Sequence, residues 1–227
     1  MKLSLPSLTN CFESAPKPFD EMKLSKAEVK QKVAELKTNG FFSIPISETT
    51  QRYLHNTNQG KGNSESQWEA KSTGTELKLP KSYNEIATRM ATAVISKVAD
   101  QKVHLETQEF QIRRPGLTPA DRWHQDRNPK VLTCLATLEG RGTEYVTPAL
   151  ARATFKHIDD KITPIEMRKG RILCKEDIKT FKKDNFYFIA SRSDVTESIP
   201  KLVHRAPAYD HKELSERAIF LSRWRPV

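Results

Sequence analysis

Glycine is scarce in this sequence, at 8 of 227 residues. Collagen-like repeats and glycine-rich low-complexity chains are therefore excluded, since both need far more glycine. Cysteine is rarer still, because Cys11, Cys134 and Cys174 are the only three and form no Cys-x-x-Cys pair. This odd, scattered set argues against a disulfide framework and against a cysteine-rich zinc site. It favours a reducing compartment, and we expect a cytoplasmic protein.

Long apolar runs are also missing. No stretch approaches the roughly 18 apolar residues of a membrane span, and the first residues, Met1–Pro6, do not begin a secretory signal. Hydrophobic residues nevertheless make up 37% of the chain and aromatic residues 8%, which is too much for a wholly disordered protein. The length suits one large domain with a real core. Because the sequence shows no membrane span, we expect no membrane association.

Negative charge is in deficit. The chain carries a formal net charge of +10, of which +2 falls on residues 1–80 and +8 on residues 81–227. A basic surface attracts polyanions, so nucleic acid is a candidate partner. A solvated Lys/Arg surface without a specific partner explains the same charge, and composition alone leaves both interpretations open.

The first part of the chain predicts an arm and a helical extension. Residues 1–24 mix Pro, Ser and Lys without periodicity, which is typical of an arm. Ser25 and Glu28 form a capping box, and Asn39-Gly40 supplies a left-handed stop, so we expect a helix between them. A short strand, Phe41–Pro45, follows at once.

A polar loop and a second helix come next. Residues 46–79 are rich in Ser, Thr, Asn, Gln and Gly and are expected to form a long loop. Ser82 and Glu85 form another capping box, which predicts a helix through about Ala99. Its expected buried stripe is Ile86, Met90, Val94 and Val98.

From about residue 103 the pattern changes to short strand-like runs separated by turn residues. The predicted strands are Glu106–Arg114, Val131–Leu138, Gly142–Val146, Asn185–Ala190, Leu202–Arg205 and Ala218–Trp224. No strand–helix–strand alternation appears, so we expect a sandwich, a barrel or a jelly roll. The predicted fold class is mainly β with flanking helices (α+β). One domain covers 25–227, with an extension over about 25–102 and a core over about 103–227, and 150–183 stays ambiguous.

The segment Trp123-His124-Gln125-Asp126 carries the main chemical signal. Residues i and i+2 of a strand point to the same face, so His124 and Asp126 can both face one ion. His204 lies 78 residues after Asp126 on another predicted strand. Two histidines and one carboxylate form the facial triad of non-haem Fe(II) sites. On spacing alone, hydrogen-bonded structural residues explain the same pattern.

The sequence around these residues resembles the Fe(II)/2-oxoglutarate-dependent dioxygenase superfamily, from about Gln108 to Trp224. The segments that carry the resemblance are Gln111–Gly116, His124–Asp126, Leu132–Leu138, Gly140–Tyr145, Asn185–Ile189 and His204–Pro207. The resemblance implies a double-stranded β-helix (jelly roll) core. It also implies Fe(II) as cofactor, with His124, Asp126 and His204 as its ligands and as the catalytic residues.

In that superfamily a basic residue about ten or more positions beyond the distal histidine binds the far carboxylate of 2-oxoglutarate. Arg217, 13 residues after His204, fits this role, since a guanidinium pairs with a carboxylate through two hydrogen bonds. Arg223 shares its strand face by parity and is the reserve candidate. The alternative for Arg217 is a surface ion pair with Glu213 or Glu216.

The sequence also departs from the superfamily pattern. Arg114 stands where a Tyr is common, Ile219 replaces a small residue, and no Gly precedes Asn185. The turn after Leu138 is shorter than usual. Arg205 has the opposite parity to His204, and we expect it to face away from the metal.

The resemblance implies an enzyme, a 2-oxoglutarate-dependent dioxygenase that hydroxylates or demethylates an unidentified substrate with 2-oxoglutarate and dioxygen. One alternative is a non-catalytic basic jelly-roll module that binds nucleic acid or an acidic partner. A cupin-like metalloenzyme without 2-oxoglutarate is another, and Arg217 has no role in it. Cys134 lies in an apolar strand and is predicted to be a buried structural thiol rather than a nucleophile.

Overall fold

The computed structural model describes residues 25–48, 81–113, 122–126, 130–156, 166–167, 173–183, 185–207 and 217–227. The predicted arm at 1–24 and most of the predicted loop at 46–79 lie outside these residues. None of the helices in the described part combines the length and apolar character that a membrane span requires.

Helix α1 (Lys26–Asn39) begins and ends where the sequence predicts. The Ser25 hydroxyl accepts from the Glu28 amide at 3.2 Å, and the Glu28 carboxylate accepts from the Ser25 amide at 2.8 Å, which confirms the capping box. Gly40 ends the helix with φ 77°, in the left-handed region. A Cβ at Gly40 would also collide with the Pro200 carbonyl oxygen, so this position needs glycine for two reasons.

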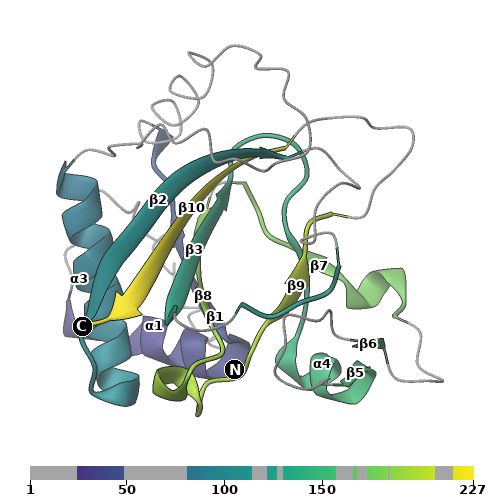
Figure 1. The fold of residues 1–227 in the computed structure, drawn as a ribbon, viewed down its shortest axis with the longest axis horizontal. Helices are drawn as coiled ribbons and strands as arrows, with labels where there is room; N and C mark the ends of the chain where they lie inside the picture. The colour runs from purple at the N-terminus through teal and green to yellow at the C-terminus, as the bar shows by residue number, and fades with distance from the viewer. Residues whose placement is uncertain are drawn as a thin grey trace, which may run out of the picture.

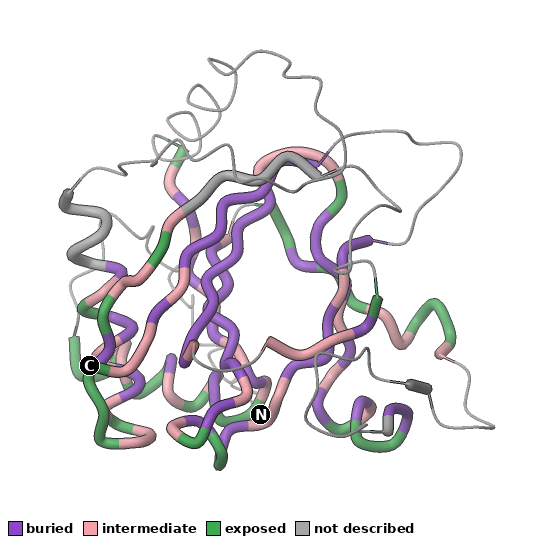
Figure 2. The backbone as a smooth tube through the Cα atoms, in the orientation of Figure 1, coloured by how far each residue is buried: buried purple, intermediate pink, exposed green. Residues whose placement is uncertain are grey.

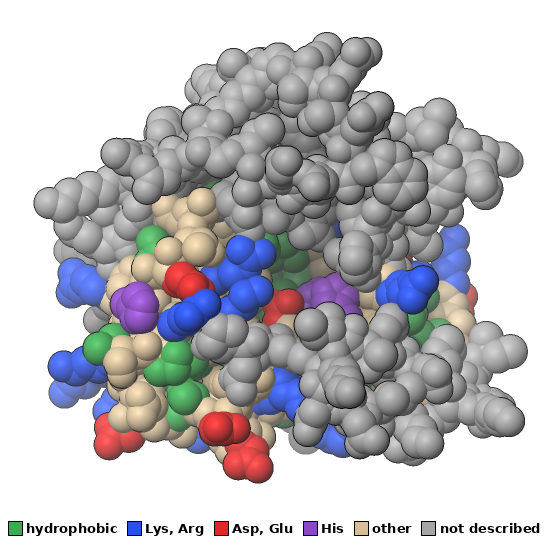
Figure 3. All heavy atoms as spheres, in the orientation of Figure 1, with side chains coloured by type: hydrophobic (Ala, Val, Ile, Leu, Met, Phe, Trp, Pro, Cys, Tyr) green, Lys and Arg blue, Asp and Glu red, His purple; other side chains and the backbone are tan. Residues whose placement is uncertain are grey.

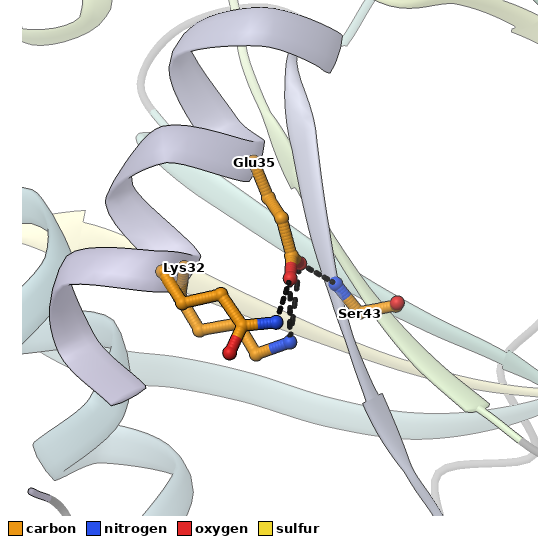
Figure 4. A network of polar contacts seen from close by, with 4 residues as sticks. Lys32, Glu35 and Ser43 are labelled. Atoms are coloured by element: carbon orange, nitrogen blue, oxygen red, sulfur yellow. Dashed lines mark hydrogen bonds and ion pairs between the residues drawn. The ribbon is translucent and has the colours of Figure 1, made fainter. Parts of the chain in front are cut away.

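A polar network fastens α1 to the strand that it feeds, β1 (Phe41–Pro45). The Glu35 carboxylate accepts from the Lys32 ammonium at 2.9 Å and from the Ser43 amide at 3.3 Å (Figure 4). Lys32 is buried, and burying a charged group is costly unless it is paired. The network therefore fixes the angle at which the chain leaves the helix.

Helix α3 (Lys81–Ala99) carries the predicted buried stripe. Met90 and Val94 are fully buried, and Val98 packs against the same core, while the side chain of Ile86 lies outside the description. The helix begins at Lys81, so Ser82 lies inside it rather than capping it. Sequence patterns fix a helix end only to within one or two residues.

Two antiparallel sheets form the body of the protein (Figure 1). The major sheet has the strand order β1-β8-β3-β10-β2, and the small sheet has the order β7-β4-β9. The strands of the major sheet after β1 are β2 (Val103–Arg113), β3 (Leu132–Thr137), β8 (Asn185–Ala190) and β10 (Arg217–Pro226). Those of the small sheet are β4 (Glu144–Val146), β7 (Lys179–Thr180) and β9 (Val203–Arg205). The mainly-β prediction with flanking helices is therefore confirmed.

The remaining elements are short. Helix α4 (Pro148–Thr154) follows β4, and a two-stranded sheet pairs β5 (Phe155–Lys156) with β6 (Glu166–Met167). Two 3-10 turns, η3 (Lys175–Asp177) and η4 (Asp194–Thr196), precede β7 and β9. Most of these fall in the region that the sequence left ambiguous.

The major sheet separates two apolar cores. Its outer face packs on α1 and α3 through a cluster that includes Leu36, Met90, Phe188 and Trp224. Its inner face, which bears alternate residues such as Leu135, faces the small sheet. All six residues of β3 are buried because both faces are covered, and Figure 2 draws the central strands as largely buried. The space between the two sheets is where the candidate site lies.

Candidate metal centre

His124 and His204 lie directly opposite each other although 80 residues separate them in the chain. They form an antiparallel bridge in which the amide of each donates to the carbonyl of the other, at 2.9 and 3.0 Å. Their ring centroids are 4.4 Å apart. The segment around His124 therefore extends the small sheet beyond β9, and backbone pairing alone holds the two rings side by side.

Asp126 completes the group that the sequence predicts. Its Oδ2 lies 4.0 Å from Nε2 of His204, and one ligand atom from each of the three residues lies within 4.8 Å of the others. The loop between β8 and β9 holds this segment in place. The Arg192 amide donates to the Asp126 carbonyl at 2.7 Å, and the Gln125 side chain donates to the Lys201 carbonyl at 3.4 Å.

Backbone carbonyls determine which nitrogen of each histidine is available. Nδ1 of His124 lies 2.7 Å from the Arg122 carbonyl, and Nδ1 of His204 lies 3.4 Å from the Leu202 carbonyl. A carbonyl oxygen only accepts, so Nδ1 carries the proton and Nε2 of the neutral ring keeps its lone pair. Metal-binding histidines usually have this arrangement, in which the nitrogen away from the metal donates to an oxygen.

The Asp126 carboxylate is ionised and has an unsatisfied oxygen. Burial raises the pKa of this carboxyl group, but electrostatic interactions with the neighbouring His204, His124 and Lys130 and a hydrogen bond from Thr133 outweigh burial and hold the pKa below the ordinary value. Oδ2 is buried and has no hydrogen-bond partner among the described residues. A buried anionic oxygen beside two imidazole lone pairs fits a divalent cation, so the residues present suit a metal ion.

A cavity opens beside these three residues. Its apolar wall comes from the inner face of the major sheet and consists of Leu135, Ile189, Ile219 and Leu221. Its cationic lining consists of Lys130, Arg205, Arg217 and Arg223. Figure 3 shows blue Lys and Arg side chains on both sides of the purple and red side chains near the centre of this face. The cavity is thus apolar on one wall and strongly positive around it.

Arg217 is the first residue of β10 and is 5% exposed. One of its terminal nitrogens donates to the Thr137 hydroxyl at 3.4 Å and also to the Thr143 hydroxyl. Arg217 is therefore not a surface residue, while Glu213 and Glu216, its alternative ion-pair partners, lie outside the described residues. Arg223, six positions along the same strand, lines the same cavity, as strand parity predicts.

The position of Arg205 agrees only in part with the strand-parity prediction that it faces away from the metal. It contributes to the lining of the cavity, but its guanidinium binds Glu144 at 2.9 Å and lies over the Trp123 ring. The charged group therefore turns away from the three clustered residues, toward a buried carboxylate of β4.

Four other residues, namely Cys134, Trp123, Trp224 and Phe181, have structural roles. Cys134 is buried in the outer core, and burial raises the pKa of its thiol far above the ordinary value, so it is no nucleophile. Trp123 and Trp224 are both buried and present no exposed platform for stacking bases. Phe181 is buried, whereas Lys179 and Lys182 on either side of it are exposed.

Sequence reasoning missed Thr137 and Lys130. Thr137 shares the inner face of β3 with Thr133 and Leu135, so strand parity was a signal that could have found it. Lys130 lies just before β3, outside any helix or strand, where no periodicity indicates which way a side chain points.

No protein-family model matches the sequence, and no curated protein matches it. Solved structures do match. The alpha-ketoglutarate-dependent carbocyclase SnoK from nogalamycin biosynthesis is 13% identical with a TM-score of 0.51, over 93% of this chain and 87% of that one. The epimerase SnoN, in complex with Fe3+, alpha-ketoglutarate and nogalamycin RO, is 14% identical with a TM-score of 0.50, over 88% and 84%. The chain has the fold of the Fe(II)/2-oxoglutarate-dependent oxygenases.

A third structure extends the comparison beyond nogalamycin enzymes. A full-length Neurospora crassa protein, solved in complex with alpha-KG and 5-formyluracil, is 12% identical with a TM-score of 0.50, over 88% of this chain and 78% of that one. In this oxygenase fold the described cavity lies between the major and small sheets, with the two histidines and Asp126 at one side. The fold prediction of a double-stranded β-helix core is confirmed.

Proposed function

We propose that this chain is a divergent Fe(II)- and 2-oxoglutarate-dependent oxygenase. The observation that carries the proposal is the cluster of His124, Asp126 and His204, whose ligand atoms lie within 4.8 Å of one another beside a cavity that Arg217 also lines. Two imidazoles and one carboxylate are the ligand set of non-haem iron oxygenases, and this set leaves coordination positions open. When bound, the iron and its oxo-acid co-substrate supply the oxidising chemistry.

Each residue then has a defined task. The Nε2 atoms of His124 and His204 and the Asp126 carboxylate would hold the metal, and the carbonyl that accepts from Nδ1 of each ring would orient Nε2 for this role. Because the carboxylate stays ionised, it offsets one of the two positive charges of the metal.

Arg217 would bind the far carboxylate of 2-oxoglutarate. The Thr137 and Thr143 hydroxyls accept from one end of its guanidinium and so orient the planar group within the cavity. A fixed, buried guanidinium suits a bidentate carboxylate contact better than a lysine would. The apolar side chains Ile219 and Leu221, on the same strand face, help to exclude water from the space between Arg217 and the metal site.

The test uses anaerobically purified protein with Fe(II) and 2-oxoglutarate. We expect about one iron per chain, a weak visible absorption band that needs both additions, and succinate formation once air is admitted. Asp126→Ala should lose all three signals. Glu176→Ala, which removes an exposed carboxylate from η3, is the matched control and should keep them. Undiminished iron in Asp126→Ala would sink the metal assignment.

The same samples separate the alternatives. A cupin-like metalloenzyme would bind iron but give no band and no succinate with 2-oxoglutarate. A non-catalytic basic module would give no iron-dependent signal and would bind mixed oligonucleotides with a steep dependence on salt.

A further inference from the structure

Asp126 is attached to the body of the protein where β3 and β8 lie side by side. Its backbone is held by the Arg192 amide, which donates to the Asp126 carbonyl at 2.7 Å. Its side chain is held by Thr133, whose hydroxyl donates a hydrogen bond to the carboxylate. Arg192 follows the end of β8, and Thr133 of β3 pairs with Ile189 of β8. One corner of the major sheet therefore anchors Asp126 at two points.

The two oxygens of the Asp126 carboxylate differ in their surroundings. Oδ2 has no hydrogen-bond partner among the described residues, and it lies 4.0 Å from Nε2 of His204. The hydrogen bond from Thr133 therefore belongs to the other oxygen, Oδ1. One oxygen of the carboxylate is thus held by the protein, while the other lies toward the clustered histidine.

A second hydroxyl supports the direction in which Thr133 donates. Oγ of Ser191 lies 3.5 Å from Oγ1 of Thr133, and the geometry allows either hydroxyl to be the donor. An ionised carboxylate only accepts, so the single proton of the Thr133 hydroxyl points to Asp126 and the Ser191 hydroxyl donates to Thr133. Thr133 is 4% exposed and Ser191 is fully buried. Hydrogen bonds that are sheltered from water in this way are electrostatically stronger than exposed ones.

We propose that Thr133 is a positioning residue, which holds Oδ1 of Asp126 so that Oδ2 is presented to the metal together with the histidine nitrogens. The proposal rests on the proposed function, which makes Asp126 a ligand of the metal. A carboxylate that is already oriented loses less conformational freedom when it binds an ion, so the hydrogen bond should raise the affinity for metal. Partners of metal ligands typically contribute about 10–100-fold to that affinity.

The experiment titrates Mn(II) into the full chain and compares variants that remove or keep the Thr133 hydroxyl. Thr133→Val has a similar volume but no hydroxyl, and we expect it to weaken Mn(II) binding about tenfold or more. Thr133→Ser keeps the hydroxyl and should recover most of the affinity. Thermal melting verifies that each variant is folded, and Thr133→Ala takes the place of Thr133→Val if the valine variant does not fold.

Thr154→Val is the matched control for this titration. Thr154 of α4 is also fully buried, but its hydroxyl has no hydrogen-bond partner in the part of the chain that the structure describes. The same chemical change at this position should therefore leave the affinity for Mn(II) unchanged.

The spectrum of a second ion distinguishes a positioning role from a purely structural one. The visible bands of Co(II) depend on the arrangement of its ligands. At saturating Co(II) we expect these bands to shift in Thr133→Val and to return in Thr133→Ser. A variant that was only less stable would bind less ion without shifting the bands.

The outcomes separate this proposal from the proposed function. An affinity and a spectrum that stay unchanged in Thr133→Val would overturn the proposal. An equal loss in Thr133→Ser or in Thr154→Val would also overturn it, because the Thr133 hydroxyl would then not be the cause. If the unaltered protein binds neither ion, the proposed function fails, and the proposal that rests on it fails with it.

Discussion

The guanidinium carbon of Arg205 lies 4.4 Å from the centroid of the Trp123 ring. Each of these residues is the immediate chain neighbour of a clustered histidine, since Trp123 precedes His124 and Arg205 follows His204. Neighbouring strand residues point to opposite faces, so the cation–π contact lies behind the two imidazoles. Glu144 of β4 binds the same guanidinium at 2.9 Å. The contact thus fastens together, from the far side, the two segments that present the histidines.

We therefore predict that Arg205→Gln weakens metal binding although Arg205 is no ligand. The variant loses the contact with Trp123 and leaves the buried Glu144 carboxylate with less compensation, so the two segments are held less firmly. Changes to residues that support metal ligands typically weaken affinity about 10–100-fold. Titration with Mn(II) measures the effect, and Arg152→Gln, at an exposed site on α4, is the control. Unchanged affinity in Arg205→Gln would show that the backbone bridge alone positions the rings.

For the co-substrate, we predict that Arg217→Gln raises the 2-oxoglutarate concentration for half-maximal band formation about tenfold or more, because a charged hydrogen bond contributes about 1.5–3 kcal/mol. The measurement is an anaerobic titration of the Fe(II)-loaded protein. Arg217→Lys should recover only part of the loss, since an ammonium cannot make the planar double contact. An unchanged titration in Arg217→Gln would transfer the role to Arg223.

Lys201 gives a prediction for pH. Burial lowers the pKa of Lys201 to about 8, although the nearby Glu197 carboxylate raises it and the Arg192 guanidinium lowers it further. In the unfolded chain the pKa of a lysine is near 10.4. Between these two values the unfolded chain binds more protons than the folded one, so this group makes the folded state more stable as pH rises. Its destabilising effect is fully present below about pH 8.

The check compares the free energy of unfolding in urea for the unaltered protein and for Lys201→Met at about pH 7 and about pH 9.5. The unaltered protein should gain relative to the variant at the higher pH. A difference that stays constant between the two pH values would mean that the ammonium remains protonated in the folded state.

Gly40 gives a prediction for folding. We expect Gly40→Ala to lower the free energy of unfolding by at least about 1–2 kcal/mol, because a left-handed conformation is unfavourable for alanine. The collision of the new methyl group with the Pro200 carbonyl adds to this cost. Urea denaturation measures it, with the exposed Thr38→Ala as the control. A loss below about 0.5 kcal/mol would show that the α1–β1 junction relaxes easily.

Much of the fold was predictable because its main elements carry their own local signals. The capping box and Gly40 mark α1, and the apolar run of β8 is bounded by polar residues, so both ranges agree closely with the structure. Helix α4 and strand β7 carry no such signal. Seven residues of helix and two of strand are too short for a period to appear, and their places are set by tertiary packing.

Only part of the candidate site was predictable from local sequence patterns. His124 and Asp126 follow from strand parity, but their meeting with His204 depends on pairing between distant segments, which only the resemblance to a family indicated. Thr143 and Arg217 come together for the same reason, from β10 and the turn before β4. Lys130 has no local pattern at all, and its position just before β3 brings it to the cavity.

The bridge between His124 and His204 links metal binding to the folding equilibrium of the protein. An ion held by both histidines would act as a cross-link that closes a loop of 80 residues. Because the unfolded chain cannot offer the same ligands together, each increase in free metal would shift the equilibrium toward the folded form. The concentration of free metal would then determine the fraction of chains that are folded, in addition to the fraction that hold the metal.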